Sequence, residues 1–201
     1  MKAWRNPGLW LVLALTAAVG IWPALASNQA YSREVAFTVL LSVCLASSLN
    51  IIQGYTGYVN FGHIVFFGLG GYVGFYLMSV HQIPLYLAVP AGALSAGLLA
   101  FLLGRAILRL RGAYFALATI GINEAARAFA KNFEPFGGPT GMTFKFRVYN
   151  AYGGANQALW IAYAILVILT LLTIFVSYLV KSSRFGLGLM AIRENEDAAE
   201  V

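Results

Sequence analysis

Residues Gln53–Gly74, QGYTGYVNFGHIVFFGLGGYVG, decide how this chain can fold. Glycine recurs throughout the stretch, polar side chains stand between the glycines, and apolar segments long enough to cross a bilayer flank it on both sides. Glycine at this density weakens a continuous helix. Inside a membrane, a helix break is tolerated only where the freed backbone groups meet protein or water. The stretch therefore predicts an interrupted helix beside a cavity or pathway, and it is the first candidate for a functional site.

The composition of the whole chain predicts an integral membrane protein. Hydrophobic residues make up 60% of the 201 residues and charged residues 10%, against about 25% charged residues in soluble domains. Apolar stretches close to the ~20 residues that a transmembrane helix needs occur at Gly8–Ala26, Val35–Ile52, Ile64–Val80, Leu85–Leu103, Tyr114–Ala130 and Leu159–Val180. We therefore expect an all-α membrane protein with about six transmembrane helices and a glycine-rich helix break. A transmembrane domain over residues 1–180 would precede a short cytoplasmic helical segment over residues 181–201.

The basic residues predict the orientation of these spans, because short loops rich in Lys and Arg stay in the cytoplasm. Such loops carry Lys2, Arg5, Arg105, Arg109, Arg111, Lys181 and Arg184. This distribution explains the net charge of +6 better than nucleic-acid binding does. The first apolar stretch also resembles a signal peptide, with Ala24–Ala26 before Ser27 as a cleavage site. A retained span and a cleaved signal both remain open, and either leaves Ser27 outside.

A series of polar residues and glycines runs from the second apolar stretch into the third. The polar residues are Ser47, Asn50, Gln53, Thr56, Asn60 and His63, at steps of three or four residues, and Gly54 and Gly57 lie between them. Steps of three or four residues keep neighbours on one helix face, but each step of three turns that face by roughly 60°. A break at residues 54–57 would relieve this drift and let the series line a solute pathway. The alternative is an ordinary cytoplasmic turn between two spans, with His63 as a hydrogen-bonded interfacial histidine.

Two ionisable residues interrupt the fifth apolar stretch. Glu124 and Arg127 lie three residues apart, a spacing at which opposite charges on a helix can pair. Charged groups at membrane depth are costly and usually functional. One interpretation is an ion pair that anchors the helix near the outer interface. The other adds both residues to the solute pathway, with Arg127 binding the carboxylate of a zwitterionic solute or Glu124 its ammonium group.

Small residues predict close packing of the third and fourth spans, since they let helix backbones approach each other in a membrane. The third span contains Gly70 and Gly74 in a G-x-x-x-G pattern. The fourth span contains Gly92, Ala93, Ala96, Gly97 and Ala100.

The loop after Lys131 is predicted to be external, and it is long and rich in glycine, with FGGPTGM at Phe136–Met142. Loops of this length are usually functional or disordered. A docking surface, an outer gate and simple flexibility are all consistent with it.

The C-terminal residues KSSRFGLGLMAIRENEDAAEV predict two short cytoplasmic helices. An apolar stripe typical of a surface helix recurs at i, i+4 and i+7, at Phe185, Leu189 and Ile192. Asn195 can cap a second helix whose first turn carries Glu196 and Asp197, where acidic side chains favour the positive end of the helix dipole. The second helix has barely begun at Val201, so we expect the chain to be part of a longer protein.

The sequence offers no catalytic or metal-binding motif. It has no G-x-x-x-x-G-K-[ST] phosphate loop, and His63 and His81 are its two histidines. The single cysteine, Cys44, cannot form an intramolecular disulfide, and no Cys/His cluster suits a metal ion. We expect this chain to bind no cofactor or metal and not to be an enzyme.

Three blocks of sequence together resemble the permease subunits of branched-chain amino acid ABC transporters, of the LivM-like type. They are LNIIQGYTGYVNFGHIVFFGLGGY at Leu49–Tyr72, LRLRGAYFALATIGINEAARAF at Leu108–Phe129 with the following GGPTGM, and SRFGLGLMAIRENEDAAE at Ser183–Glu200. The order and spacing of the blocks match as well. The resemblance therefore covers most of the chain after the first span.

The resemblance implies a permease in the bacterial inner membrane that pairs with a second permease subunit, two cytoplasmic ATPases and a periplasmic solute-binding protein. ATP would bind to the ATPase subunits, and their closure would switch the permease between outward-open and inward-open states. In such transporters a short cytoplasmic helical segment docks on the ATPase. The resemblance assigns this coupling role to Arg184, Gly186, Arg193, Glu194, Glu196, Asp197, Ala198 and Ala199.

Two departures accompany the resemblance. Chains of the family continue through further membrane helices after the coupling segment, so these 201 residues would form an incomplete permease. The family usually has an acidic residue where this chain has Ala113.

Permeases for urea or short amides share the same blocks, so these cargoes stay open beside branched-chain or similar apolar amino acids. An ion-coupled secondary transporter would show an inverted repeat, and a membrane scaffold would leave the glycine-rich break unexplained.

Overall fold

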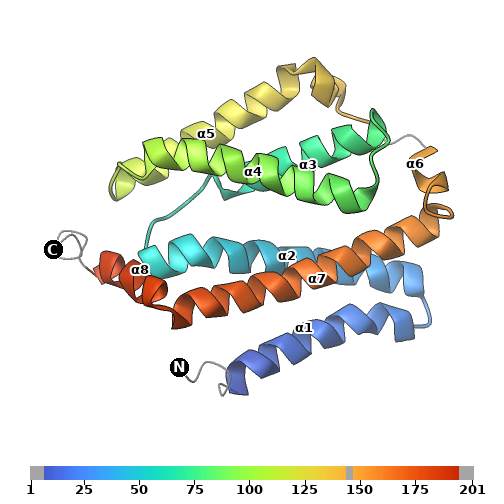
Figure 1. The fold of residues 1–201 in the computed structure, drawn as a ribbon, viewed down its shortest axis with the longest axis horizontal. Helices are drawn as coiled ribbons and strands as arrows, with labels where there is room; N and C mark the ends of the chain where they lie inside the picture. The colour runs from blue at the N-terminus through green and yellow to red at the C-terminus, as the bar shows by residue number, and fades with distance from the viewer. Residues whose placement is uncertain (1–6, 144–146, 195–201) are drawn as a thin grey trace. The chain divides into compact units, whose positions relative to one another are not determined.

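The computed structural model describes residues 7–143 and 147–194, and its regular secondary structure within these ranges is entirely helical. Two compact units are present, one formed by Met1–Tyr58 with Leu159–Val201 and the other by Val59–Ala158. The elements in chain order (Figure 1) are α1 (Pro7–Leu25), α2 (Gln29–Thr56), α3 (His63–Ser79), α4 (Leu85–Ile107), α5 (Ala113–Asn132), η2 (Glu134–Phe136), η3 (Gly138–Thr140), α6 (Arg147–Asn150), α7 (Ala155–Ser182) and α8 (Arg184–Glu194).

In the first unit, α1, α2 and α7 pack around an apolar core. Its buried residues are Ala36 and Leu40 of α2 together with Tyr163 and Leu166 of α7. Spacings of four and three residues place each pair on one helix face, so each helix contributes a single stripe to the core. The hydroxyl of Tyr163 donates a hydrogen bond of 3.0 Å to the carbonyl oxygen of Gly20 on α1. This bond ties α1 to α7.

Hydroxyl groups also link α2 and α7. Thr170 is fully buried, and its hydroxyl lies 3.3 Å from the carbonyl oxygen of Leu40. Near the end of α2, the hydroxyl of Tyr55 lies 3.0 Å from both the main-chain oxygen and the side-chain oxygen of Ser177. Interhelical hydrogen bonds of this kind fix the register of neighbouring helices where apolar packing alone leaves it free.

In the second unit, α3 and α4 pack with their backbones in contact. A Cβ atom placed on Gly92 would lie 2.5 Å from the carbonyl oxygen of Gly70, and one placed on Gly70 would lie 3.0 Å from the carbonyl oxygen of Gly92. One turn along, a Cβ on Gly74 would lie 3.3 Å from the carbonyl oxygen of Ala88. The predicted close packing of the third and fourth spans is confirmed.

The long loop between α5 and α7 has structure of its own in its short helices η2, η3 and α6. Phe136 is 7% exposed and stacks on Tyr72 of α3, with ring centroids 4.9 Å apart. It also meets the ring of Phe129 on α5 edge to face at 6.2 Å. Further along, the hydroxyl of Tyr152 accepts a hydrogen bond from the main-chain N–H of Leu85 at the start of α4. The loop is thus anchored at two places within the second unit.

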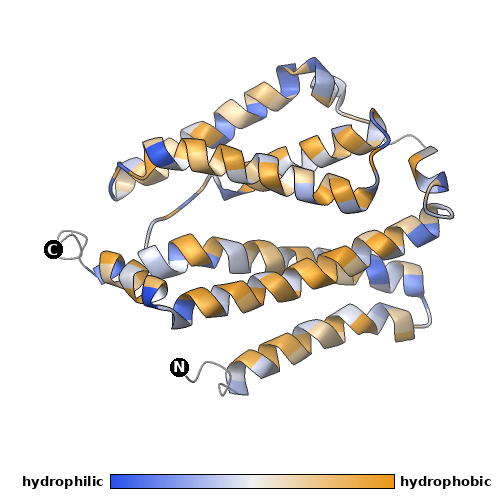
Figure 2. Ribbon diagram, in the orientation of Figure 1, coloured by the Kyte–Doolittle hydropathy of each residue, from blue (hydrophilic) through white to orange (hydrophobic). Residues whose placement is uncertain are grey.

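The helices identify a multi-pass membrane protein. Among the described residues, α1, α2, α4 and α7 are long and apolar enough to cross a membrane. Figure 2 shows hydrophobic residues along α1 and α7, with hydrophilic residues collecting toward the ends of α7. The other two predicted spans correspond to α3, which is apolar but has 17 residues, and to α5, which has 20 residues and carries charged side chains. The count of six spans stays a prediction.

Candidate functional site

Helix α2 runs into the glycine-rich stretch and ends there at a polar residue, Thr56. α2 continues through Gly54 and ends at Thr56, and Gly57 follows in a left-handed conformation with φ 76° and ψ −3°. Glycine adopts this conformation readily because it has no Cβ atom. The hydroxyl of Thr56 donates to the carbonyl oxygen of Ile52 at 2.7 Å, and its oxygen accepts the N–H of Tyr58 at 3.4 Å. The turn therefore begins at Gly57, and its depth in the membrane stays a prediction.

Residues 59–62 belong to the second unit, where they dock on α5. Asn60 is 8% exposed, and its side-chain oxygen accepts the N–H of Gly62 at 2.8 Å. The N–H of Phe61 donates to the hydroxyl oxygen of Thr119 at 3.2 Å, and a Cβ on Gly62 would lie 3.0 Å from the carbonyl oxygen of Thr119. Thr119 was not predicted from the sequence. Its one distinguishing feature there is a hydroxyl group within an apolar run of α5.

The remaining residues of the polar series lie on two different helices. Asn50 and Gln53 are exposed on α2, and the side chain of Asn50 lies over Gly54. His63 is half-buried as the first residue of α3. The series is thus divided where α2 ends and does not form one continuous helix face. The role of these residues in a solute pathway stays a prediction.

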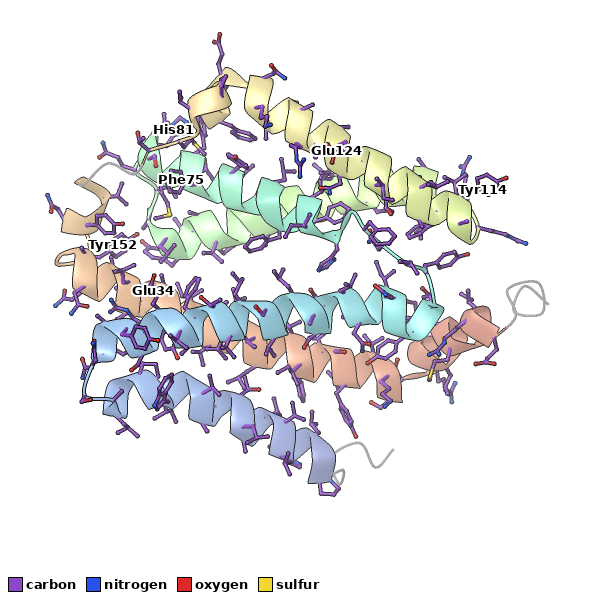
Figure 3. The ribbon with its side chains drawn as sticks, turned by 180° about the vertical axis from the view of Figure 1, so that it is seen from behind. Glu34, Phe75, His81, Tyr114, Glu124 and Tyr152 are labelled. Carbon is purple, nitrogen blue, oxygen red and sulfur yellow. The ribbon has the colours of Figure 1, made fainter. Side chains whose placement is uncertain are left out.

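Glu124 and Arg127 form the expected pair on α5, with 3.6 Å between Arg127 Nη1 and Glu124 Oε1. Their side chains are 61% and 62% exposed, respectively. Figure 3 shows Glu124 in the middle of α5, well along the helix from Tyr114 near its start. Within the described parts of the chain, no group of three or more His, Cys, Asp or Glu side chains could hold a metal ion. The pair thus presents one positive and one negative group side by side.

The first of the two predicted C-terminal helices is present as α8. The hydroxyl of Ser183 caps it by accepting the N–H of Gly186 at 3.1 Å. Gly186 is buried, and a Cβ atom there would overlap the carbonyl oxygen of Val180 at the end of α7. Of the apolar stripe that the sequence indicated, Leu189 and Ile192 are half-buried, whereas Phe185 is 68% exposed. The close approach at Gly186 places this residue on the packed face of α8.

The far end of α8 contacts the end of α2 (Figure 1). Arg193 Nη1 donates a hydrogen bond of 3.0 Å to the carbonyl oxygen of Gly54. Arg193 Cγ would lie 3.1 Å from a Cβ atom placed on Gly57. The predicted coupling segment therefore touches the predicted helix break directly, which the sequence alone did not indicate.

The other predicted coupling residues are distributed along and beyond α8. Arg184 is its first residue and Glu194 its last, and both are exposed. The predicted second helix, with its cap at Asn195, and the coupling residues Glu196, Asp197, Ala198 and Ala199 lie outside the described residues. The assignment of the coupling role to this segment stays a prediction.

Comparison with known proteins identifies the family. A family model described as "Branched-chain amino acid transport system / permease component" matches residues 33–201. The chain belongs to this permease family. The match begins in α2 and includes the helix end at Thr56, the α5 pair and α8. The family is one of transport permeases, which are not enzymes themselves.

Two curated relatives share the LivM-like character that the sequence indicated. The chain is 32% identical over 136 residues to the high-affinity branched-chain amino acid transport system permease protein LivM of Escherichia coli (strain K12). The identity is also 32% over 136 residues with the protein of the same name from Salmonella typhimurium (strain LT2). Each match covers 67% of this chain and 31% of the relative, so the chain spans about a third of the length of these permeases. No solved structure matches the chain.

Proposed function

We propose that this chain forms part of the membrane-spanning permease of an ATP-driven importer for branched-chain or similar apolar amino acids. The permease alternates between outward-open and inward-open states. ATP is bound and hydrolysed by separate ATPase subunits, and this chain binds no cofactor. A second permease subunit and a periplasmic solute-binding protein complete the transporter in the bacterial inner membrane.

The observation that carries this proposal is the contact between α8 and the end of α2. An ATPase on the cytoplasmic side can act on a transported solute only through a segment that contacts both the ATPase and the helices around the pathway. Arg193 of α8 is hydrogen-bonded to Gly54, three residues before the left-handed Gly57. A segment that docks on an ATPase would therefore be joined to the glycine-rich stretch by a direct contact.

The α5 pair supports a zwitterionic solute over a neutral one. A free amino acid brings a carboxylate and an ammonium group, and each needs a partner of opposite charge once it leaves water. Arg127 and Glu124 supply one of each, and their side chains are more than half exposed. Urea and short amides need only hydrogen-bond donors and acceptors. In this proposal the apolar side chain of the amino acid is accommodated by the surrounding apolar helices.

Reconstitution tests the function. The permease, its second permease subunit, both ATPases and the solute-binding protein are placed in proteoliposomes, and uptake of radiolabelled leucine is measured with ATP or with a non-hydrolysable analogue. Uptake that requires ATP and the binding protein is the expected result. ATP-independent uptake driven by a proton or sodium gradient would replace the proposal with a secondary transporter.

The cargo is tested by competition and by charge-neutral variants. Excess isoleucine or valine should suppress leucine uptake, whereas excess urea or acetamide should not. Glu124→Gln combined with Arg127→Gln keeps the net charge and removes both charged partners, so leucine uptake should fall. If the double variant takes up leucine normally, the pair only anchors the helix and the zwitterion assignment fails.

A further inference from the structure

The contact between Arg193 and the end of α2 has the chemistry of a helix cap supplied by another helix. Gly54 is among the last four residues of α2, whose carbonyl groups have no partner further along the helix. These carbonyls carry the negative end of the helix dipole. A guanidinium group offers five N–H donors in a rigid plane, and its hydrogen bonds are charge-assisted. Arg193 therefore stabilises the last turn of α2 from outside that helix.

The aliphatic part of Arg193 reaches the turn itself. Its Cγ would be 3.1 Å and its Cβ 3.8 Å from a Cβ atom on Gly57. A side chain at position 57 would have to push Arg193 away by a few tenths of an ångström, and the φ of 76° also disfavours one. A single side chain thus touches both the last helical turn and the residue at which the chain leaves the helix.

The first turn of α8 is also held by close contacts, here with the end of α7. Gly186 lies against the carbonyl oxygen of Val180, and Ser183 caps the helix start. Gly186 and Arg193 are seven residues apart, so they lie on one face about 10 Å from each other along the axis. α8 therefore acts as a strut between the end of α7 and the end of α2.

We propose that Arg193 is a positioning residue that latches α8 to α2, so that displacement of α8 moves the turn at Gly57. The inference rests on the proposed function, since engagement of an ATPase supplies the displacement. It differs from the assignment that the resemblance gave, in which Arg193 belongs to the surface that docks on the ATPase. A latch acts inside the permease, and removing it breaks the link to α2 without weakening the ATPase contact.

Hydrogen–deuterium exchange on the assembled transporter in nanodiscs tests the latch independently of transport. Arg193→Gln removes the charge-assisted bond, so amide exchange in the peptide that covers residues 55–60 should rise by about tenfold or more. Arg193→Lys keeps a cation and should restore part of the protection. Arg109→Gln removes the same charge from an exposed position at the α4–α5 turn and serves as the matched control. It should leave exchange in this peptide unchanged.

Coupling is measured on the same variants as leucine taken up per ATP hydrolysed. Arg193→Gln should lower this ratio severalfold, because the displacement of α8 would no longer reach α2, while the ATPase subunits stay bound and continue to hydrolyse ATP. Gly57→Ala should act in the same way, because its methyl group would push Arg193 aside. If both changes act through one contact, the double variant is no worse than the more severe single variant.

The possible outcomes separate the two proposals. If amide exchange is unchanged in Arg193→Gln, the latch proposal is wrong. If the ATPase subunits are also released from this variant, Arg193 is instead a docking residue. If the wild-type transporter shows no ATP-dependent leucine uptake, the proposed function fails. The exchange measurement then still decides whether Arg193 holds the end of α2.

Discussion

The close crossing of α3 and α4 predicts how much stability is lost when each of its glycines is replaced by alanine. A Cβ atom on Gly92 would lie 2.5 Å from the carbonyl oxygen of Gly70, whereas ordinary contact begins at 3.4 Å. Gly92→Ala must therefore separate the two backbones by roughly 0.9 Å or bend α4, and overpacking of this kind costs about 1–3 kcal/mol. A Cβ atom on Gly70 would lie 3.0 Å from the carbonyl oxygen of Gly92, and one on Gly74 would lie 3.3 Å from that of Ala88. Gly70→Ala should therefore cost less than Gly92→Ala, and Gly74→Ala should cost least.

Gly97 provides the matched control on the same helix. It is exposed, and a Cβ atom there would meet nothing within 4 Å. Gly97→Ala should be neutral, or stabilising by up to ~1 kcal/mol through reduced freedom of the unfolded chain. The assay is equilibrium unfolding in mixed micelles, read as the free energy of unfolding. Equal stability of Gly92→Ala and Gly97→Ala would refute the argument that backbone contact determines this crossing.

Three further substitutions test contacts elsewhere. Tyr55→Phe removes the hydroxyl that meets Ser177 and should lower the free energy of unfolding by about 1 kcal/mol; an unchanged value would show that the bond adds nothing. Gly186→Ala should displace α8, because the methyl group would overlap the carbonyl oxygen of Val180, and cysteine cross-linking between α8 and α7 should lose efficiency. Phe136→Ala should destabilise the protein by about 3–5 kcal/mol and expose the α5–α7 loop to protease; unaltered proteolysis would mean that other contacts hold the loop.

The helices themselves could be predicted from the sequence because apolar runs of near-spanning length leave few other structures in a membrane. α1 covers Pro7–Leu25, within one residue of the predicted stretch at each end. The α3–α4 contact could also be anticipated, since small residues at positions such as Gly70 and Gly92 have few other uses in apolar helices. These signals depend on residue type and spacing, which the sequence states directly.

The end of α2 was less accessible to sequence reasoning. Gly54 and Gly57 are equally able to interrupt a helix on propensity alone. The structure separates them by backbone conformation, because Gly54 stays helical while Gly57 adopts positive φ. Thr56 decides the position by satisfying the backbone on both sides of the turn. No periodicity in the sequence carries that information.

Hydrogen bonds between a side chain and the main chain could not be predicted at all. The guanidinium group of Arg193 donates a hydrogen bond to the carbonyl oxygen of Gly54, and the hydroxyl of Tyr152 accepts one from the main-chain N–H of Leu85. Every residue type carries these backbone groups, apart from the missing N–H of proline, so the partner leaves no signature in its own sequence. The resemblance to the permease family gave Arg193 an external partner, because it places this residue in the segment that docks on the ATPase.

The polar residues of the glycine-rich stretch now fall into two classes with different chemistry. Thr56 and Asn60 use their side-chain oxygens on nearby backbone groups, which a helix end in an apolar environment must satisfy. Their polarity is explained by the turn itself. Asn50 and Gln53 are instead exposed on α2. Substitution of the first class should therefore destabilise the fold. Substitution of the second should change uptake at unchanged stability if the predicted solute pathway runs past α2, so Asn50 and Gln53 are the stronger candidates for that pathway.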